Sequence, residues 1–174
     1  MTKVINLWAG PGAGKSTIAA DLFAEMKWQG HNVELINEVA KTLTWEGHHN
    51  ILQDQLYVSA MQNRKLQRLL GKVDWIITDS PLLLCAAYIP DHYKSSFLDM
   101  IIDMWNQYDN ENFFIVRKKP YSPIGRNQDE SGARQLDTAV RRLMHAHLPR
   151  SIDVDGDRSA KYQIINKIFS EPAQ

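Results

Sequence analysis

The chain has little cysteine: Cys85 is the only one among its 174 residues, so no internal disulfide can form. Cys85 lies in the apolar run PLLLCAAYI (81–89), which favours a buried thiol over a nucleophile. This longest apolar run is far shorter than the roughly 20 residues that a membrane-spanning helix needs, so we expect no membrane span. Net charge is also lacking, because twenty basic and twenty acidic residues cancel. The chain therefore has no overall positive field for nucleic acid, and any such contact would have to be local.

The N-terminus lacks the features of a secretory leader. After three residues the chain passes into VINLW (4–8), which is typical of a buried strand and carries no small-residue cleavage site. We therefore expect a cytoplasmic protein. With 44% hydrophobic residues, a chain of this length can bury one sizeable core, and we expect a single domain over residues 1–174.

Short apolar strands alternate with longer helical patterns, as in a parallel sheet with crossover helices. The pattern predicts an α/β fold with a five-stranded parallel sheet flanked by helices. The expected strands are 4–8, 33–37, 74–78, 113–117 and 151–154. The expected helices include one that starts at Lys15 and ends at Gly30, one long helix over about 50–71, and another over about 93–108. A further helix, 131–148, precedes the last strand.

A glycine-rich turn, AGPGAGKST (9–17), follows the first strand and opens the first helix. It fits the phosphate-binding loop pattern except that Ala9 stands at the first position, where glycine is usual. Backbone N–H groups of such a turn and the positive end of the helix neutralise nucleotide phosphates, while Lys15 adds a charge and Ser16 offers a hydroxyl to Mg²⁺. The residues expected to bind ATP are Gly10, Gly12, Ala13, Gly14, Lys15, Ser16 and Thr17.

Two carboxylates are expected at the same edge of the sheet. Asp79 ends the apolar segment VDWIITD, and Glu38 follows the second strand in VELINE. Ligands bind at the carboxyl ends of parallel strands, so Asp79 can hold Mg²⁺ directly or through water, or can cap the next helix. Glu38 can take a proton from an acceptor hydroxyl, or can simply favour a helix dipole.

The segment 118–134 is rich in Pro, Gly, Ser and charge, and we interpret it as a lid. Arg126 in this segment and Arg134 on the helix that follows are the candidate cations for the transferring phosphoryl group. Arg117, Arg141 and Arg142 are weaker candidates. The alternative is a solvated helix face in which Asp137 pairs with Arg134 or Arg141.

An acceptor pocket is expected between the second strand and the long helix after it. The side chains there that can stack on a ring or hydrogen-bond to it are Trp45, His48, Gln53, Tyr57 and Gln62. Packing or surface exposure explains most of them equally well, so only one or two are expected to contact a substrate. The turn DVDGD (153–157) is expected near the nucleotide base, with Asp157 capping the last helix.

Five segments together resemble the small phage-encoded and bacterial P-loop kinases often labelled "ATPase/kinase". They are GPGAGKST, LINEVAK, WEGHHNILQDQLYVSAMQ, TDSPLLL and GRNQDESGARQLD. The chain is similar to the ribosylnicotinamide kinase domain and to phage kinases of hydroxymethylpyrimidines in DNA. The resemblance implies a P-loop fold with Lys15 and Ser16 at ATP-Mg²⁺, Asp79 or Glu38 as the catalytic or metal-organising carboxylate, and Arg126 and Arg134 as lid cations.

Three functional hypotheses remain open from the sequence. The first is an ATP-dependent kinase of a hydroxyl on a nucleoside, nucleotide or modified nucleobase, with a small molecule favoured over DNA as acceptor. The second is a nucleoside monophosphate kinase, in which Glu38 would be dispensable; Ser16 in place of the second glycine of Gly-Lys-Gly-Thr weakens it. The third is a nucleotide-dependent switch or accessory ATPase that recruits a partner.

Overall fold

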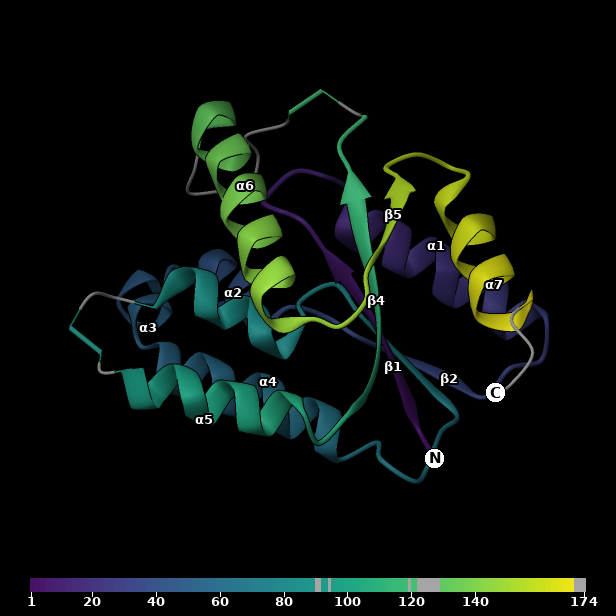
Figure 1. Ribbon diagram of the computed structural model, residues 1–174, viewed down its shortest axis with the longest axis horizontal. Helices are drawn as coiled ribbons and strands as arrows, with labels where there is room; N and C mark the ends of the chain where they lie inside the picture. Colours follow the sequence, from purple (N-terminus) through teal and green to yellow (C-terminus); the bar gives the residue numbers. More distant parts are fainter. Residues whose placement is uncertain (90–91, 94, 119, 122–128, 171–174) are drawn as a thin grey trace.

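The computed structural model describes residues 1–89, 92–93, 95–118, 120–121 and 129–170. Within these residues the strands form one five-stranded sheet in the order β2-β3-β1-β4-β5 (Figure 1). All of the paired strands are parallel, which confirms the predicted sheet. The strands are β1 (Lys3–Trp8), β2 (Val33–Ile36), β3 (Trp75–Thr78), β4 (Asp109–Val116) and β5 (Ile152–Asp155).

Helices cover both faces of the sheet (Figure 1). On one face lie α1 (Lys15–Trp28) and α7 (Ala160–Ser170). On the other face lie α2 (Val39–Trp45), α4 (Gln55–Gln67), the 3₁₀ helix η1 (Leu82–Tyr88), α5 (Ser95–Trp105) and α6 (Glu130–His147), with the short α3 (His49–Gln53) beside α2 and α4. Among the described residues, every helix is too short or too polar to span a bilayer.

The central strand β1 supplies side chains to two cores. Val4 and Trp8 join the cluster under α4, α5 and α6, whereas Ile5 and Leu7 join the cluster under α1 and α7. All four are at most 1% exposed. A strand buried on both faces has apolar side chains in succession, which is why VINLW is almost wholly hydrophobic.

Two predicted elements differ most clearly from the structure. The helix expected over 50–71 is divided into α3 and α4, because Asp54 caps the second helix by accepting a hydrogen bond from the Tyr57 N–H at 3.0 Å. Strand β4 starts at Asp109, four residues before the predicted position. Its polar residues pair there with β1: the side chain of Asn112 accepts a hydrogen bond from the Trp8 indole at 3.0 Å.

The sheet order places the candidate site residues at one edge of the sheet. The turns after β1, β2, β3, β4 and β5 all leave the sheet at its carboxyl end, because every strand is parallel to its neighbours. The glycine-rich turn follows the central strand, and its neighbours at this edge come from β3 and β4. A ligand at this edge therefore meets residues from several segments that are distant in sequence.

Candidate active site

The glycine-rich turn has the backbone shape of a phosphate-binding loop. Gly12 and Gly14 have φ angles of 78° and 104°, a region that side chains other than glycine rarely adopt. Helix α1 begins directly after Gly14, at Lys15, so its N-terminus and the preceding N–H groups can bind an anion. The Lys15 Nζ donates hydrogen bonds to the carbonyls of Ala9 at 2.8 Å and Gly10 at 3.1 Å, which holds the amine over the start of the loop.

Helix α6 is packed against this loop at Gly10. The Gly10 N–H donates a hydrogen bond to Asp137 Oδ1 at 2.6 Å. A Cβ at Gly10 would lie only 2.6 Å from the Ala133 carbonyl oxygen, so this approach requires the absence of a side chain. The carboxylate of Asp137 thus fixes the backbone of the loop.

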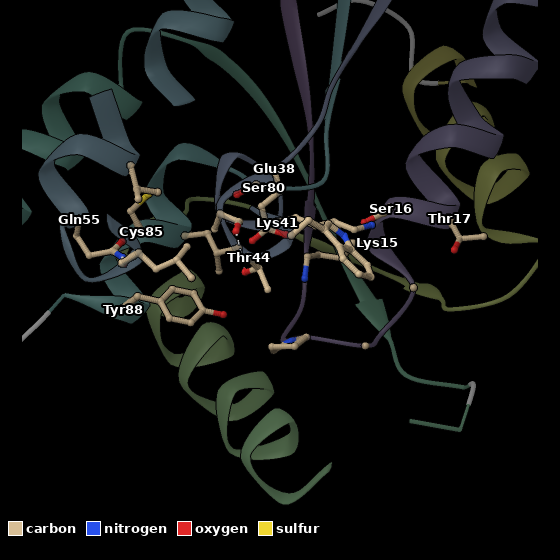
Figure 2. A pocket seen from close by; sticks show the side chains of 18 residues that line it. Lys15, Ser16, Thr17, Glu38, Lys41, Thr44, Gln55, Ser80, Cys85 and Tyr88 are labelled. Atoms are coloured by element: carbon tan, nitrogen blue, oxygen red, sulfur yellow. Dashed lines mark hydrogen bonds between the residues drawn. The ribbon is translucent and has the colours of Figure 1, made fainter. Parts of the chain in front are cut away.

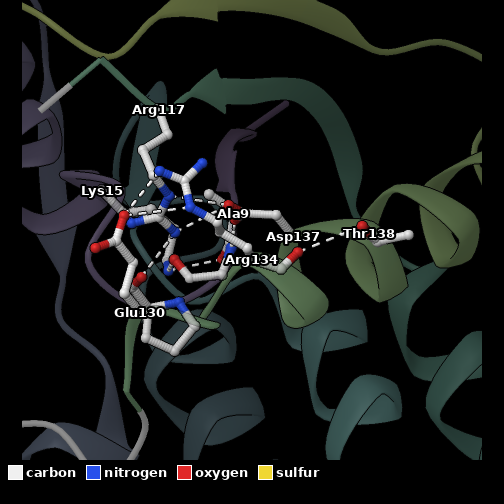
Figure 3. Close-up of polar contacts among 9 residues, drawn as sticks. Ala9, Lys15, Arg117, Glu130, Arg134, Asp137 and Thr138 are labelled. Atoms are coloured by element: carbon white, nitrogen blue, oxygen red, sulfur yellow. Dashed lines mark hydrogen bonds and ion pairs between the residues drawn. The ribbon is translucent and has the colours of Figure 1, made fainter. Parts of the chain in front are cut away.

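Arg117, the first residue after β4, completes this contact (Figure 3). Its Nε and Nη2 donate to Asp137 Oδ2 at 3.0 and 2.9 Å, and Nη2 also donates to the Pro11 carbonyl at 2.8 Å. The side chain is only 8% exposed. Its remaining nitrogen, Nη1, is buried, and within the described part of the chain it has no hydrogen-bond partner.

Two other arginines considered from the sequence, Arg134 and Arg141, form ion pairs with other carboxylates. Arg134 pairs with Glu130 on the same helix at 2.8 Å and is 64% exposed, and Arg141 pairs with Asp153 at 2.7 Å. Arg126 lies outside the described residues. Asp137 pairs with Arg117 rather than with Arg134 or Arg141, the pairing considered as the alternative from the sequence. The position of Arg117 at the end of a predicted strand was the signal for its role.

The two predicted carboxylates come together. Asp79, at the end of β3, is 1% exposed, and its Oδ1 accepts a hydrogen bond from the Glu38 backbone N–H at 3.0 Å. Asp79 thus organises the turn after β2 rather than capping a helix of its own. Glu38 is the N-cap residue of α2, but its side chain makes no capping hydrogen bond.

Gln62 holds the next residue of the same turn. Its Oε1 accepts from the Val39 N–H at 3.3 Å, and its Nε2 donates to the Ser80 carbonyl at 3.1 Å and to the Thr78 hydroxyl at 3.3 Å. Gln62 is 1% exposed, so it stabilises the turn from the protein interior. The start of α2, and with it Glu38, is therefore fixed from two sides.

A cavity of about 340 Å³ connects these groups (Figure 2). One wall is the phosphate loop with the start of α1, and the other walls come from α2, α3, α4 and η1. Its polar and aromatic lining residues are Lys15, Ser16, Thr17, Glu38, Lys41, Thr44, Trp45, Gln55, Ser80, Cys85 and Tyr88. Glu38 lines the cavity, whereas Asp79 is not among its lining residues.

The cavity lies where the acceptor pocket was expected, with different side chains. Of the five candidates, Trp45 lines it and is 65% exposed. His48, Gln53 and Tyr57 do not line it, and Gln62 is buried behind it. Gln55, on the buried face of α4, lines the cavity instead. The break at Asp54 sets which face of α4 turns inward, and the sequence prediction of one continuous helix missed it.

Two titratable groups in the wall keep their protons. Burial, with a smaller contribution from the charge of Glu38, raises the pKa of the Cys85 thiol to about 12. The same two causes, in the same order, raise the pKa of the Tyr88 hydroxyl well above its usual value. Both groups are therefore neutral at physiological pH. The Cys85 thiol cannot act there as a thiolate nucleophile.

Sheet order and loop shape together define an α/β P-loop fold, and the P-loop implies nucleotide binding. The family model described as "AAA domain" matches residues 4–161, and the chain belongs to this family. No curated protein sequence matches the chain.

Solved structures show the same fold at low sequence identity. Deoxyadenosine kinase from M. mycoides with the products dCMP and dCDP bound is 18% identical, with a TM-score of 0.63 over 97% of this chain and 100% of that one. The same kinase with dATP bound is 16% identical, with a TM-score of 0.58 over the same shares.

Proposed function

We propose that the protein is an ATP-dependent phosphotransferase that moves the γ-phosphoryl group to a hydroxyl of a nucleoside, nucleotide or modified nucleobase. One observation carries the proposal: a single cavity of about 340 Å³ is lined both by the phosphate loop at Lys15 and by the carboxylate of Glu38. A kinase needs its donor and acceptor sites to be continuous in this way. A nucleotide-dependent switch does not need a second pocket at its phosphate loop.

The donor side is built from the loop and the first turn of α1. The loop N–H groups and the Lys15 amine would hold the phosphates of ATP. The Ser16 hydroxyl and the Asp79 carboxylate would hold Mg²⁺, since both are hard oxygen donors at the carboxyl edge of the sheet. When bound, the ion would neutralise charge on the transferring group.

Glu38 is the proposed base. The acceptor hydroxyl oxygen attacks the γ-phosphorus, the bond to the β,γ-bridging oxygen breaks, ADP leaves, and the hydroxyl proton passes to the Glu38 carboxylate. Glu38 fits this role better than Asp79, because Glu38 lines the cavity and Asp79 does not. Arg126 and Arg134 remain the proposed lid cations.

The size of the cavity favours a small acceptor. Pockets for small molecules are typically about 300–1,000 Å³, and this one lies at the lower end of that range. The deoxyadenosine kinase of similar fold was solved with dCMP and dATP bound, which supports a nucleoside-like acceptor. A DNA base turned out of its helix is the alternative, and it would bring a strong dependence on salt.

The first experiment is transfer of labelled γ-phosphate from ATP-Mg²⁺ to a panel of acceptors. The panel contains nucleosides, nucleoside monophosphates, ribosylnicotinamide, and DNA with plain or hydroxymethylated pyrimidines, with Lys15→Ala as the blank. Label on one acceptor is expected. Release only as free phosphate, or no release, would overturn the kinase proposal in favour of a switch.

Glu38→Gln tests the proposed base once an acceptor is known. Loss of the general base should lower kcat by about 10²–10⁴-fold, with little change in ATP affinity. Glu34→Gln is the matched control, because Glu34 lies on β2 and pairs with Lys27 at the surface. An unchanged kcat in Glu38→Gln would overturn the role of Glu38 as base and favour transfer to a phosphate oxygen of the acceptor, which needs no base.

A further inference from the structure

The structure contains a buried cation with an unused donor beside the phosphate loop. Arg117 donates hydrogen bonds from Nε and Nη2 to Asp137 and the Pro11 carbonyl, while Nη1 is buried and has no hydrogen-bond partner among the residues that the structure describes. A buried donor left without a partner costs about 1–3 kcal/mol, and native proteins contain few of them. Such a group at a binding loop indicates a ligand that supplies the missing acceptor.

The position of Nη1 beside the loop indicates which part of a bound nucleotide this nitrogen would contact. Nη1 lies 3.2 Å from the point where a Cβ of Gly12 would stand. Pro11 and Gly12 line the proposed acceptor cavity together with Lys15. Lys15 Nζ rests on the carbonyls of Ala9 and Gly10, immediately before the Pro11 carbonyl that Arg117 holds. The two cations thus converge on the start of the loop (Figure 3).

We propose that Arg117 binds the γ-phosphate of ATP through Nη1, and that Asp137 is the positioning residue that keeps the guanidinium there. The lysine of a P-loop reaches the β- and γ-phosphates, so a second cation beside it meets the same end of the nucleotide. The planar guanidinium of arginine suits a phosphate oxygen. This proposal deepens the proposed function and rests on it for the place of the γ-phosphate.

The contact also links the nucleotide to α6. The Asp137 carboxylate accepts from Arg117 on one oxygen and from the Gly10 N–H on the other. A phosphate that binds the guanidinium would therefore change the position of both the loop and helix α6. The Tyr121 ring also approaches this part of the loop, since its Cδ2 lies 2.8 Å from the Cβ position of Gly12.

The test is nucleotide affinity, measured by calorimetry with ATP-Mg²⁺ and ADP-Mg²⁺ on the full chain. Arg117→Gln should weaken ATP by about tenfold or more, because a charge-assisted hydrogen bond is lost, and should weaken ADP by less than about threefold. Arg141→Gln is the matched control: it breaks a bidentate pair with Asp153 that is exposed on both sides, whereas the pair of Arg117 is buried.

Asp137→Asn separates positioning from folding. It keeps the shape of the side chain and should reproduce part of the ATP-specific loss, while thermal unfolding without nucleotide confirms that the variant is folded. Equal affinities in wild type and Arg117→Gln, or equal losses for ATP and ADP, would overturn the proposal. Because nucleotide binding is measured without any acceptor, failure of this proposal can be distinguished from failure of the kinase proposal in the transfer assay.

Discussion

The Asp79 carboxylate accepts a hydrogen bond from the backbone N–H of Glu38, so one acidic residue holds the other in place. The two follow strands β3 and β2, which are adjacent in the sheet and parallel. Parallel pairing aligns their carboxyl ends, which is why residues 41 positions apart meet. Roles proposed for the two carboxylates are therefore coupled, and variants must separate position from charge.

Asp79→Asn and Asp79→Ala are expected to differ. The asparagine carbonyl can still accept from the Glu38 N–H, so this variant should keep nearly the stability of the wild type while losing the negative charge. The alanine variant leaves a buried N–H without its partner and should lose about 1–3 kcal/mol in the free energy of unfolding. Urea unfolding checks the difference. Equal stability of the two variants would mean that the hydrogen bond contributes little.

Gly10→Ala is expected to weaken nucleotide binding. The new Cβ would meet the Ala133 carbonyl at 2.6 Å and Asp137 Oδ1 at 2.8 Å, both on α6, so helix and loop must move apart. We expect a loss of ATP affinity of about tenfold or more, since the loop geometry sets the phosphate site. Gly47→Ala is a control for backbone strain alone, because Gly47 has a φ of 73° but a Cβ there meets nothing within 4 Å; it should lower stability without this loss of ATP affinity. Unaltered ATP binding in Gly10→Ala would show that the contact is dispensable.

Stability should fall in alkaline solution. Burial raises the pKa of Cys85 to about 12 and that of Tyr108 to about 12. The unfolded chain releases these protons first, from pKa values of 9.0 and 10.0, so the stabilisation is complete below pH 9 and is lost as the pH rises toward 12. Each group adds a slope of up to about 1.4 kcal/mol per pH unit.

Urea midpoints of the wild type, Cys85→Ala and Tyr108→Phe between pH 7 and pH 11 provide the measurement. Each variant lacks one ionisable group and should show a flatter fall above pH 9. A variant with the same slope as the wild type would place the loss of stability in other groups.

Local sequence patterns were sufficient for much of the fold. The apolar strands, the glycine-rich turn and the cap signal at Gly30 depend on hydrophobic period and backbone freedom, which are properties of neighbouring residues. They predicted a five-stranded parallel sheet with a phosphate loop at Lys15, and the structure has both. The division of the helix at Asp54 was missed, because apolar spacing continues across a cap.

The sequence by itself determined the loop, the strand that precedes it and the residue types that can hold a nucleotide, because these lie within a few positions of one another. Only the tertiary structure decided which distant groups join them. It brought Arg117 and Asp137 to the loop, placed Glu38 in the cavity, and directed Arg134 to a pair on its own helix. Such choices depend on strand order and helix packing, which no local spacing encodes.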